Sequence, residues 1–184
     1  MLLPAFAQGV IKDNVLNWAS LYLAARFLMD LAQLPFFILL IPAVSFLGRM
    51  CYPLFYRLCG QDQARVSQLC FAGCLLLSAP LILGGFSRVP AVVLLVLLST
   101  LGNVMNTSFL SIFPMSMEHT GQVSAIASVM DVVTYSGLGL SSAVFGALID
   151  AFGLWGYQIM FAAFALFALL GLLLLQRAKR RSAG

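Results

Sequence analysis

Six long apolar segments divide this 184-residue chain and limit the folds that it can adopt. A helix that crosses a bilayer needs about 20 mostly apolar residues, and each segment is of that length. The apolar residues also run continuously instead of alternating, which is not the pattern of a membrane β-barrel strand. We therefore predict an all-α, polytopic membrane protein with six transmembrane helices. The predicted spans are residues 3–26, 31–50, 66–86, 90–115, 122–149 and 155–176.

Composition excludes the main soluble classes. Apolar residues make up 62% of the chain and charged residues 9%, against about 45–50% and about 25% in an ordinary soluble domain. A water-soluble enzyme is therefore excluded. The net charge is +4, but the basic residues form no patch with interleaved aromatics, so we expect no nucleic-acid partner.

The distribution of basic residues predicts the topology. Six spans put both termini on one side, and cytoplasmic loops carry an excess of Lys and Arg. Lys12 falls within a span and is not counted. Seven basic residues lie on the side of the termini and two, Arg26 and Arg88, on the other; the seven are Arg49, Arg57, Arg65, Arg177, Lys179, Arg180 and Arg181. We expect a multi-pass protein of the cell (inner) membrane with both termini cytoplasmic, a six-span domain over residues 1–176 and a basic cytoplasmic tail over 177–184.

Short polar or glycine-containing segments separate the spans, and several prolines lie within or beside them. The predicted turns are residues 26–30, 60–63, 84–88, 118–121 and 150–156. Proline removes a backbone donor and disturbs a helix. We expect local bends or breaks at Pro35, Pro42, Pro53, Pro80 and Pro114.

The first span carries two charges and two amides. A charge at the centre of a membrane helix costs roughly 2.5–3.5 kcal/mol and tends to face a cavity or a partner. Lys12 and Asp13 are adjacent and cannot share a helical face, so their charges need not cancel each other locally. Asn14 and Asn17 follow at a spacing that places them on one face. In the alternative interpretation the span begins only at Val15, with Lys12 and Asp13 at the membrane interface.

The fourth and fifth spans also contain polar faces. In the fifth, five side chains follow helical spacing along one stripe: Ser124, Ser128, Asp131, Tyr135 and Ser142. Asp131 is about as far from its end of the span as Lys12 is, which predicts a Lys12–Asp131 ion pair at a common depth. Two interpretations remain open: the polar stripe has a function, or the Lys12–Asp131 pair is purely structural. In the fourth span Asn103, Asn106 and Thr107 cluster on one face.

Features of catalytic and metal sites are missing from the sequence. His119 is the only histidine, and no phosphate-binding glycine motif occurs. The four cysteines, at 51, 59, 70 and 74, lack the spacing of a zinc site and are interpreted as small buried hydrophobes. We expect neither an enzyme nor a bound cofactor. Small residues between Ser136 and Gly146 indicate close helix packing.

The stretch Gly9–Leu23 resembles the start of the C-terminal half of the major facilitator superfamily. More narrowly, it is similar to the organophosphate:phosphate antiporters, the glycerol-3-phosphate and hexose-phosphate carriers. The residues that match the seventh helix of that family are Lys12, Asp13, Trp18, Tyr22 and Leu23, whereas Asn14 and Ser20 stand where Gly and Pro are usual. Gly121–Gly153, ending in Asp150-Ala151-Phe152-Gly153, resembles the eleventh helix and the turn after it. The resemblance covers essentially the whole chain, as helices seven to twelve.

Two positions depart from the family pattern. The family usually has Arg where this chain has Lys12, and Lys offers a point charge instead of a planar fork. In Tyr52–Arg57 the family's acidic residue is replaced by Tyr56.

The resemblance implies three-plus-three inverted repeats and secondary transport of a small anionic solute, with a phosphorylated one favoured. Lys12 would contact the anion and Asp131 would hold or release Lys12. The remaining candidate binding residues are Asp13, Asn14, Asn17, Asn103, Asn106 and Tyr135. The alternatives are a sensor of the same fold that binds without transport, and a nonfunctional truncated fragment.

The expected partners are membrane lipid, the solute, and either a complementary N-terminal half or a second copy, because such carriers hold substrate between two halves. The chain is interpreted as a fragment, a split subunit or a dimerising half. Met1 directly before the first span favours a truncated reading frame.

Overall fold

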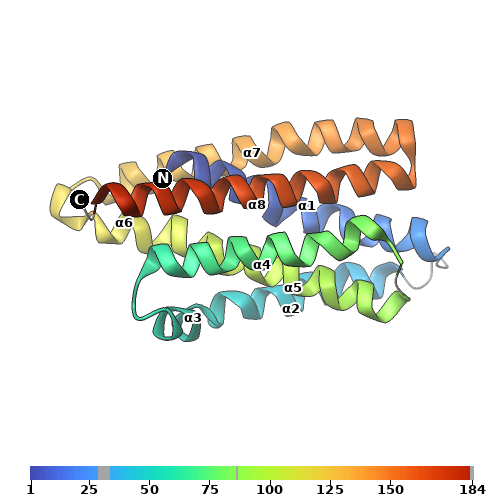
Figure 1. Ribbon diagram of the computed structural model, residues 1–184, viewed down its shortest axis with the longest axis horizontal. Coiled ribbons are helices and arrows are strands. Elements are labelled where there is room, and N and C mark those ends of the chain that lie inside the picture. Colours follow the sequence, from blue (N-terminus) through green and yellow to red (C-terminus); the bar gives the residue numbers. More distant parts are fainter. Residues whose placement is uncertain (29–33, 86, 183–184) are drawn as a thin grey trace.

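The chain folds into long helices that run roughly side by side (Figure 1). A computed structural model describes residues 1–28, 34–85 and 87–182. The elements are α1 (Leu2–Phe27), α2 (Leu34–Met50), α3 (Tyr52–Leu58), α4 (Gln63–Leu83), α5 (Arg88–Thr107), the π-helical segment η1 (Ser108–Ile112), α6 (Phe113–Ser116), the 3-10 turn η2 (Glu118–Thr120), α7 (Val123–Phe152) and α8 (Leu154–Ser182). The prediction of an all-α protein is confirmed for these residues, which contain no strand.

Four to five of these helices are long and apolar enough to cross a membrane. Within the described residues, four continuous stretches qualify, namely Gln63–Leu83, Arg88–Ser116, Val123–Phe152 and Leu154–Arg180. The bent pair of Pro35–Met50 and Tyr52–Leu58 qualifies as a fifth when it is taken as one span. The chain is therefore a multi-pass helical membrane protein. Helix α1 has 26 residues, but it is outside this group.

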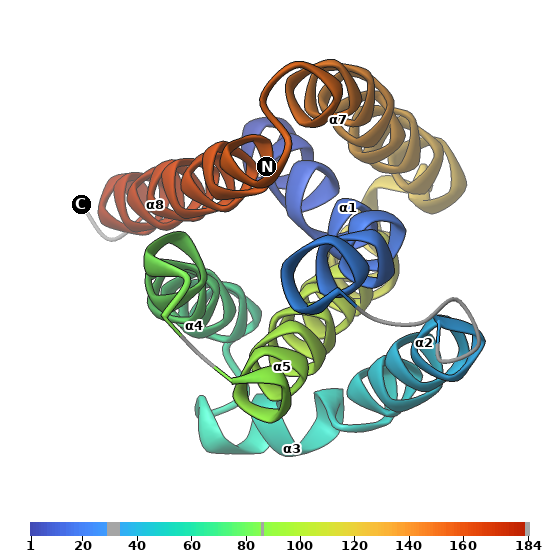
Figure 2. The ribbon, with the colours of Figure 1, turned by 90° about the vertical axis from the view of Figure 1, so that its right-hand side faces the viewer.

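Helix α1 lies inside the bundle and α7 at its edge. Helix α1 packs against α5, α7 and α8, while α5 also contacts α2 and α4, and α4 packs along α8 (Figure 2). Fourteen residues of α1 are buried, against four of the 30 residues of α7. Four polar residues of α1, namely Gln8, Lys12, Asn14 and Ser20, are therefore enclosed by other helices, whereas Asn17 is exposed.

Glycines allow α1 and α7 to approach closely. A Cβ atom added at Gly9 would lie 2.0 Å from the carbonyl oxygen of Thr134, and one at Gly137 would lie 2.5 Å from that of Phe6. Small residues at a helix interface permit such contact between backbones. The packing prediction is thus confirmed at Gly137, whereas a Cβ at Gly139 would meet open space.

Two of the five singled-out prolines coincide with helix breaks. Helices α2 and α3 are bent by 47° at a break that Pro53 follows in the first turn of α3. Pro114 follows η1, where the Phe113 N–H donates to the carbonyl of Ser108, five residues earlier. Proline clashes with the carbonyl four residues before it, which favours such a widened turn. Pro42 and Pro80 lie within α2 and α4, which continue through them, and Pro35 lies in the first turn of α2.

The predicted spans agree with the helices to within a few residues, except at the C-terminal end. Gly84 and Gly121 have positive φ at two of the predicted turns. Helix α8 does not end at 176 but continues to Ser182, because Lys and Arg favour helix and are stabilised near a helix C-terminus. Parts of the predicted first turn, second span, third span, third turn and tail fall on 29–33, 86 and 183–184, outside the described residues.

Candidate functional site

Lys12 lies in the middle of α1 with only 6% of its surface exposed. Gly102 allows α5 to approach it, since a Cβ at Gly102 would lie 3.1 Å from the Cα of Lys12. The Nζ atom of Lys12 is 2.9 Å from Oδ1 of Asp13. These neighbours are therefore paired although they do not share a helical face, because the flexible lysine stem spans the angle between adjacent helix positions. Helix α1 is continuous from Leu2 through Lys12 and Asp13.

The predicted Lys12–Asp131 ion pair is not formed. Thr134 of α7 lies against Gly9 of α1. Lys12 is three residues beyond Gly9 and Asp131 three residues before Thr134, which separates them by about 9 Å along the bundle. Among the described residues Asp131 makes no ion pair. Equal distances from the predicted span ends gave the wrong depth because α1 and α7 are offset along their axes.

The amides of α5 face α1 and α2. The Oδ1 atom of Asn103, a residue 3% exposed, accepts a hydrogen bond of 3.2 Å from Nε of Arg49. Oδ1 of Asn106 lies 3.3 Å from Nε2 of Gln8, which donates to it. The structure therefore brings Asn103 and Asn106 together with Lys12 at the centre of the bundle.

Arg49 is a candidate residue that the sequence analysis missed. A Cβ at Gly48 would lie 2.8 Å from the carbonyl of Thr100, so α2 meets the α5 backbone there and its next residue reaches Asn103. Asn103 is near the middle of the Arg88–Ser116 helix, so Arg49 lies at mid-bundle depth and not in a loop, although its own surface is exposed. The sequence did contain an indication that Arg49 lies within a span, because apolar residues continue after it through α3. Without Arg49 the predicted basic bias becomes six to two.

Gln8 was also missed. It is completely buried on α1, and its Oε1 atom has no hydrogen-bond partner within the described part of the chain. It is four residues before Lys12, which puts both on one side of α1. A polar residue at helical spacing from a buried charge was the indication in the sequence.

The remaining predicted residues are dispersed. Asn14 donates to the hydroxyl of Ser141, 2.7 Å away, and therefore joins α1 to α7. Asn17 is exposed, so the shared face predicted for Asn14 and Asn17 divides into a buried and an open side. Tyr135 is 55% exposed on α7. Within the described residues, neither Asn14 nor Tyr135 makes a hydrogen bond with Lys12, Asn103 or Asn106.

A groove of about 340 Å³ separates α1 from α2. Its α1 wall includes Asn17 and Ser20, and its α2 wall includes Pro42. The complete lining is Leu16, Asn17, Ser20, Leu21, Ile38 and Pro42. Asp13, Asn17 and Ser20 follow helical spacing, so the groove and Asp13 share one side of α1.

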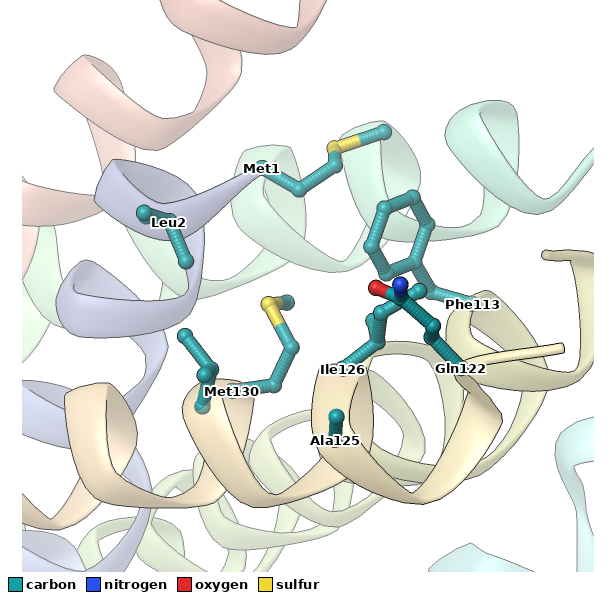
Figure 3. Close-up of a pocket in the computed structure, with 8 residues that line it drawn as sticks. Met1, Leu2, Phe113, Gln122, Ala125, Ile126 and Met130 are labelled. Atoms are coloured by element: carbon teal, nitrogen blue, oxygen red, sulfur yellow. The ribbon is translucent and has the colours of Figure 1, made fainter. Parts of the chain in front are cut away.

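A second cavity, of about 320 Å³, lies between the first residues of α1, α6 and the start of α7 (Figure 3). Gln122 is its one polar side chain, and its lining is Met1, Leu2, Phe113, Gln122, Ala125, Ile126, Val129 and Met130. It contains no charged side chain and none of the predicted site residues. It is therefore not suited to an anion.

The chemistry of the site follows from the charges near its centre. We define the central cluster as Gln8, Lys12, Asp13, Arg49, Asn103 and Asn106. It holds two cations and one carboxylate, hence one net positive charge, together with amide groups. The described residues contain no group of three or more His, Cys, Asp or Glu side chains that could hold a metal ion.

Comparisons of the chain with protein-family models, curated proteins and solved structures give no significant match. The central cluster and its position in the bundle are therefore the basis for assigning a function.

Proposed function

We propose that this chain forms one half of the translocation path of a secondary transporter, and that its solute is a small anion, with phosphorylated solutes favoured. The observation that carries the proposal is the burial of Lys12 at the centre of a membrane bundle, against Gly102 of α5. Intramembrane charge is costly and is retained mainly for function. The resemblance of Gly9–Leu23 to the phosphate-ester carriers supports the same class of solute.

The central cluster suits an anion better than a cation. Its net charge is positive, and the amides of Gln8, Asn103 and Asn106 supply donors that can turn toward an oxyanion. Lysine binds phosphate as a point charge. Asp13 takes the role first expected of Asp131, because it is the carboxylate that holds Lys12 in the absence of solute.

The path needs a second wall. Secondary carriers hold substrate near the bilayer midplane between two repeats. We propose that a complementary half, or a second copy of the chain, covers the open side of α1 and α2 in the cell membrane, with both termini cytoplasmic.

Exchange across proteoliposomes tests the function. Vesicles that contain the full chain and internal inorganic phosphate are mixed with external radiolabelled phosphate and, separately, with labelled glucose 6-phosphate. We expect uptake that Lys12→Gln abolishes. Binding of either probe without uptake would favour the sensor alternative. Absence of both binding and uptake, in well-inserted protein, would contradict the proposal.

A further inference from the structure

We propose that Arg49 is a second anion contact, and that the uncharged part of an organic anion occupies the groove between α1 and α2. This inference rests on the proposed function, because both concern the same bound anion. It adds a contact residue on α2 and a location for the rest of the ligand.

Arg49 is the cation of the central cluster that lacks a carboxylate partner. Lys12 is paired with Asp13, whereas Arg49 makes no ion pair with any described residue. Its Nε donates to Asn103, and its guanidinium carbon lies 5.8 Å from the centre of the Phe46 ring. Its two terminal nitrogens make no hydrogen bond within the described chain. A guanidinium held at Nε presents those nitrogens as a planar fork, which suits an oxyanion.

Two glycines bring the cations to the same part of α5. Gly48 permits contact between α2 and α5 next to Arg49, and Gly102 permits contact between α1 and α5 next to Lys12. Gly102 and Asn103 are consecutive residues, so both cations lie at one level of α5. An anion bound at this level of α5 would lie near both cations, one of them already paired with Asp13.

The groove begins on the same sides of α1 and α2 as these charges. Arg49 is seven residues after Pro42, which puts both on one face about 10 Å apart. Asp13 is one turn before Asn17 on α1. A ligand that bridges this separation places its anionic group at Arg49 and its uncharged part beside the groove lining.

The groove lining indicates an organic ligand. Leu16, Leu21, Ile38 and Pro42 offer apolar contact, and Asn17 and Ser20 offer hydrogen bonds to hydroxyl groups. A cavity of about 340 Å³ lies within the range of small-molecule sites, which is roughly 300–1,000 Å³. Inorganic phosphate would leave this groove empty, so the site should prefer a hydroxylated organic phosphate.

Calorimetric titration of the purified full chain tests the inference with glucose 6-phosphate and inorganic phosphate as probes. Arg49→Gln keeps a donor for Asn103 but removes the charge, and it should weaken binding of both probes by about ten-fold or more. Arg49→Lys should retain part of the affinity. The matched control is Arg57→Gln, which removes an exposed arginine on α3 and should leave both affinities unchanged.

A groove variant separates the two parts of the inference. Ile38 is 53% exposed, so Ile38→Trp fills the groove without overpacking a buried site. The substitution should weaken the binding of glucose 6-phosphate by at least about five-fold and leave the affinity for inorganic phosphate unchanged. Thermal unfolding verifies that each variant is folded.

The possible failures are distinguishable. If folded wild-type protein binds neither probe, the proposed function fails and this inference fails with it. If both probes bind and Lys12→Gln abolishes binding but Arg49→Gln does not, only the inference about Arg49 is overturned. An equal loss of affinity for both probes in Ile38→Trp would overturn the assignment of the groove.

Discussion

The ion pair of Lys12 and Asp13 determines the chemistry available at the centre of the bundle. Lys12 is 7% exposed at its side chain and Asp13 18%. Two partly desolvated charges attract strongly, and removal of one partner leaves the other uncompensated. The pair is therefore expected to stabilise the fold in the absence of solute, while Lys12 remains available to an anion that displaces the carboxylate.

Lys12→Gln should lower both stability and anion affinity. It leaves the Asp13 carboxylate unpaired, which we expect to reduce the free energy of unfolding by about 1–3 kcal/mol; this is below the ~3–5 kcal/mol of fully buried pairs because Asp13 retains some exposure. Binding of glucose 6-phosphate should be lost. Chemical unfolding in detergent and calorimetric titration measure the two effects.

The double variant Lys12→Gln/Asp13→Asn identifies the partner of Lys12. It should restore stability, because no charge is left unpaired, but it should not restore binding. Asp131→Asn combined with Lys12→Gln is the control and should restore neither. Recovery of stability with Asp131→Asn would show that Asp131, and not Asp13, compensates Lys12.

At the scale of helices, the contact between α1 and α7 positions the polar face of α1. Gly9 and Gly137 bring the two backbones together, and the hydrogen bond from Asn14 to Ser141 fixes their register. Asn14 therefore has a packing function in this structure. The offset set by these contacts is also what separates Asp131 from Lys12.

Gly9→Ala should destabilise the bundle. The new Cβ would lie 2.0 Å from the Thr134 carbonyl, so α1 and α7 must move apart, at an expected cost of about 1–3 kcal/mol. The control is Gly139→Ala on α7, where a Cβ would meet open space and should be neutral or stabilising. Thermal unfolding compares the two variants. Equal stability of both would contradict the close contact between α1 and α7.

The ends of α4 and α8 are joined by an ion pair that should be sensitive to pH. Asp62 caps the N-terminus of α4 and lies 2.5 Å from Nζ of Lys179. Burial alone would raise the pKa of Asp62, but hydrogen bonds from Lys179 and from the backbone N–H groups of Arg65 and Ala64, with the charge of Lys179, lower it below its ordinary value of 3.8. The carboxylate therefore stabilises the folded chain above 3.8, and this stabilisation disappears as pH falls through the lower folded-state pKa.

Asp62→Asn should reduce this part of the pH dependence. Asparagine is also a good N-cap, so the substitution removes the charge and keeps the cap. Between about pH 5 and about pH 3, the thermal unfolding midpoint of the wild type should fall more steeply than that of the variant. Parallel curves for the two proteins would show that Asp62 does not contribute to acid sensitivity.

At the scale of the whole molecule, the orientation in the membrane can be tested at two serines. Ser87 precedes α5 and Ser182 ends α8. In a background without the four native cysteines, Ser87→Cys should react with an impermeant thiol reagent added to intact cells. Ser182→Cys should react only after permeabilisation, because the basic residues favour the cytoplasmic side. The opposite labelling pattern would reverse the proposed topology.

The assembly is a further property of the whole molecule. Asn17 is exposed and Asp131 partly exposed on the open sides of α1 and α7, and polar groups facing lipid are unfavourable. We expect a complementary half or a second copy to cover them. Cross-linking in membranes and the mass of the detergent-solubilised particle measure this. A stable monomer that binds glucose 6-phosphate with full affinity would contradict the expectation.

The sequence by itself determined the helical class, the approximate bounds of the long helices and the presence of polar groups on α1, α5 and α7. These follow from local properties, because hydropathy and helix-breaking residues act within a segment. The predicted span ends at 176, where the apolar run ends, whereas helix α8 continues through the basic residues to Ser182.

The tertiary structure decided which polar groups meet. The Lys12–Asp13 pair, the Arg49–Asn103 hydrogen bond and the separation of Asp131 from Lys12 depend on the rotation and axial offset of neighbouring helices. Hydropathy does not encode either quantity, since they are set by contacts at Gly9, Gly48 and Gly102, where one backbone reaches another. Arg49 therefore became a candidate only when the packing of α2 on α5 placed it beside Asn103.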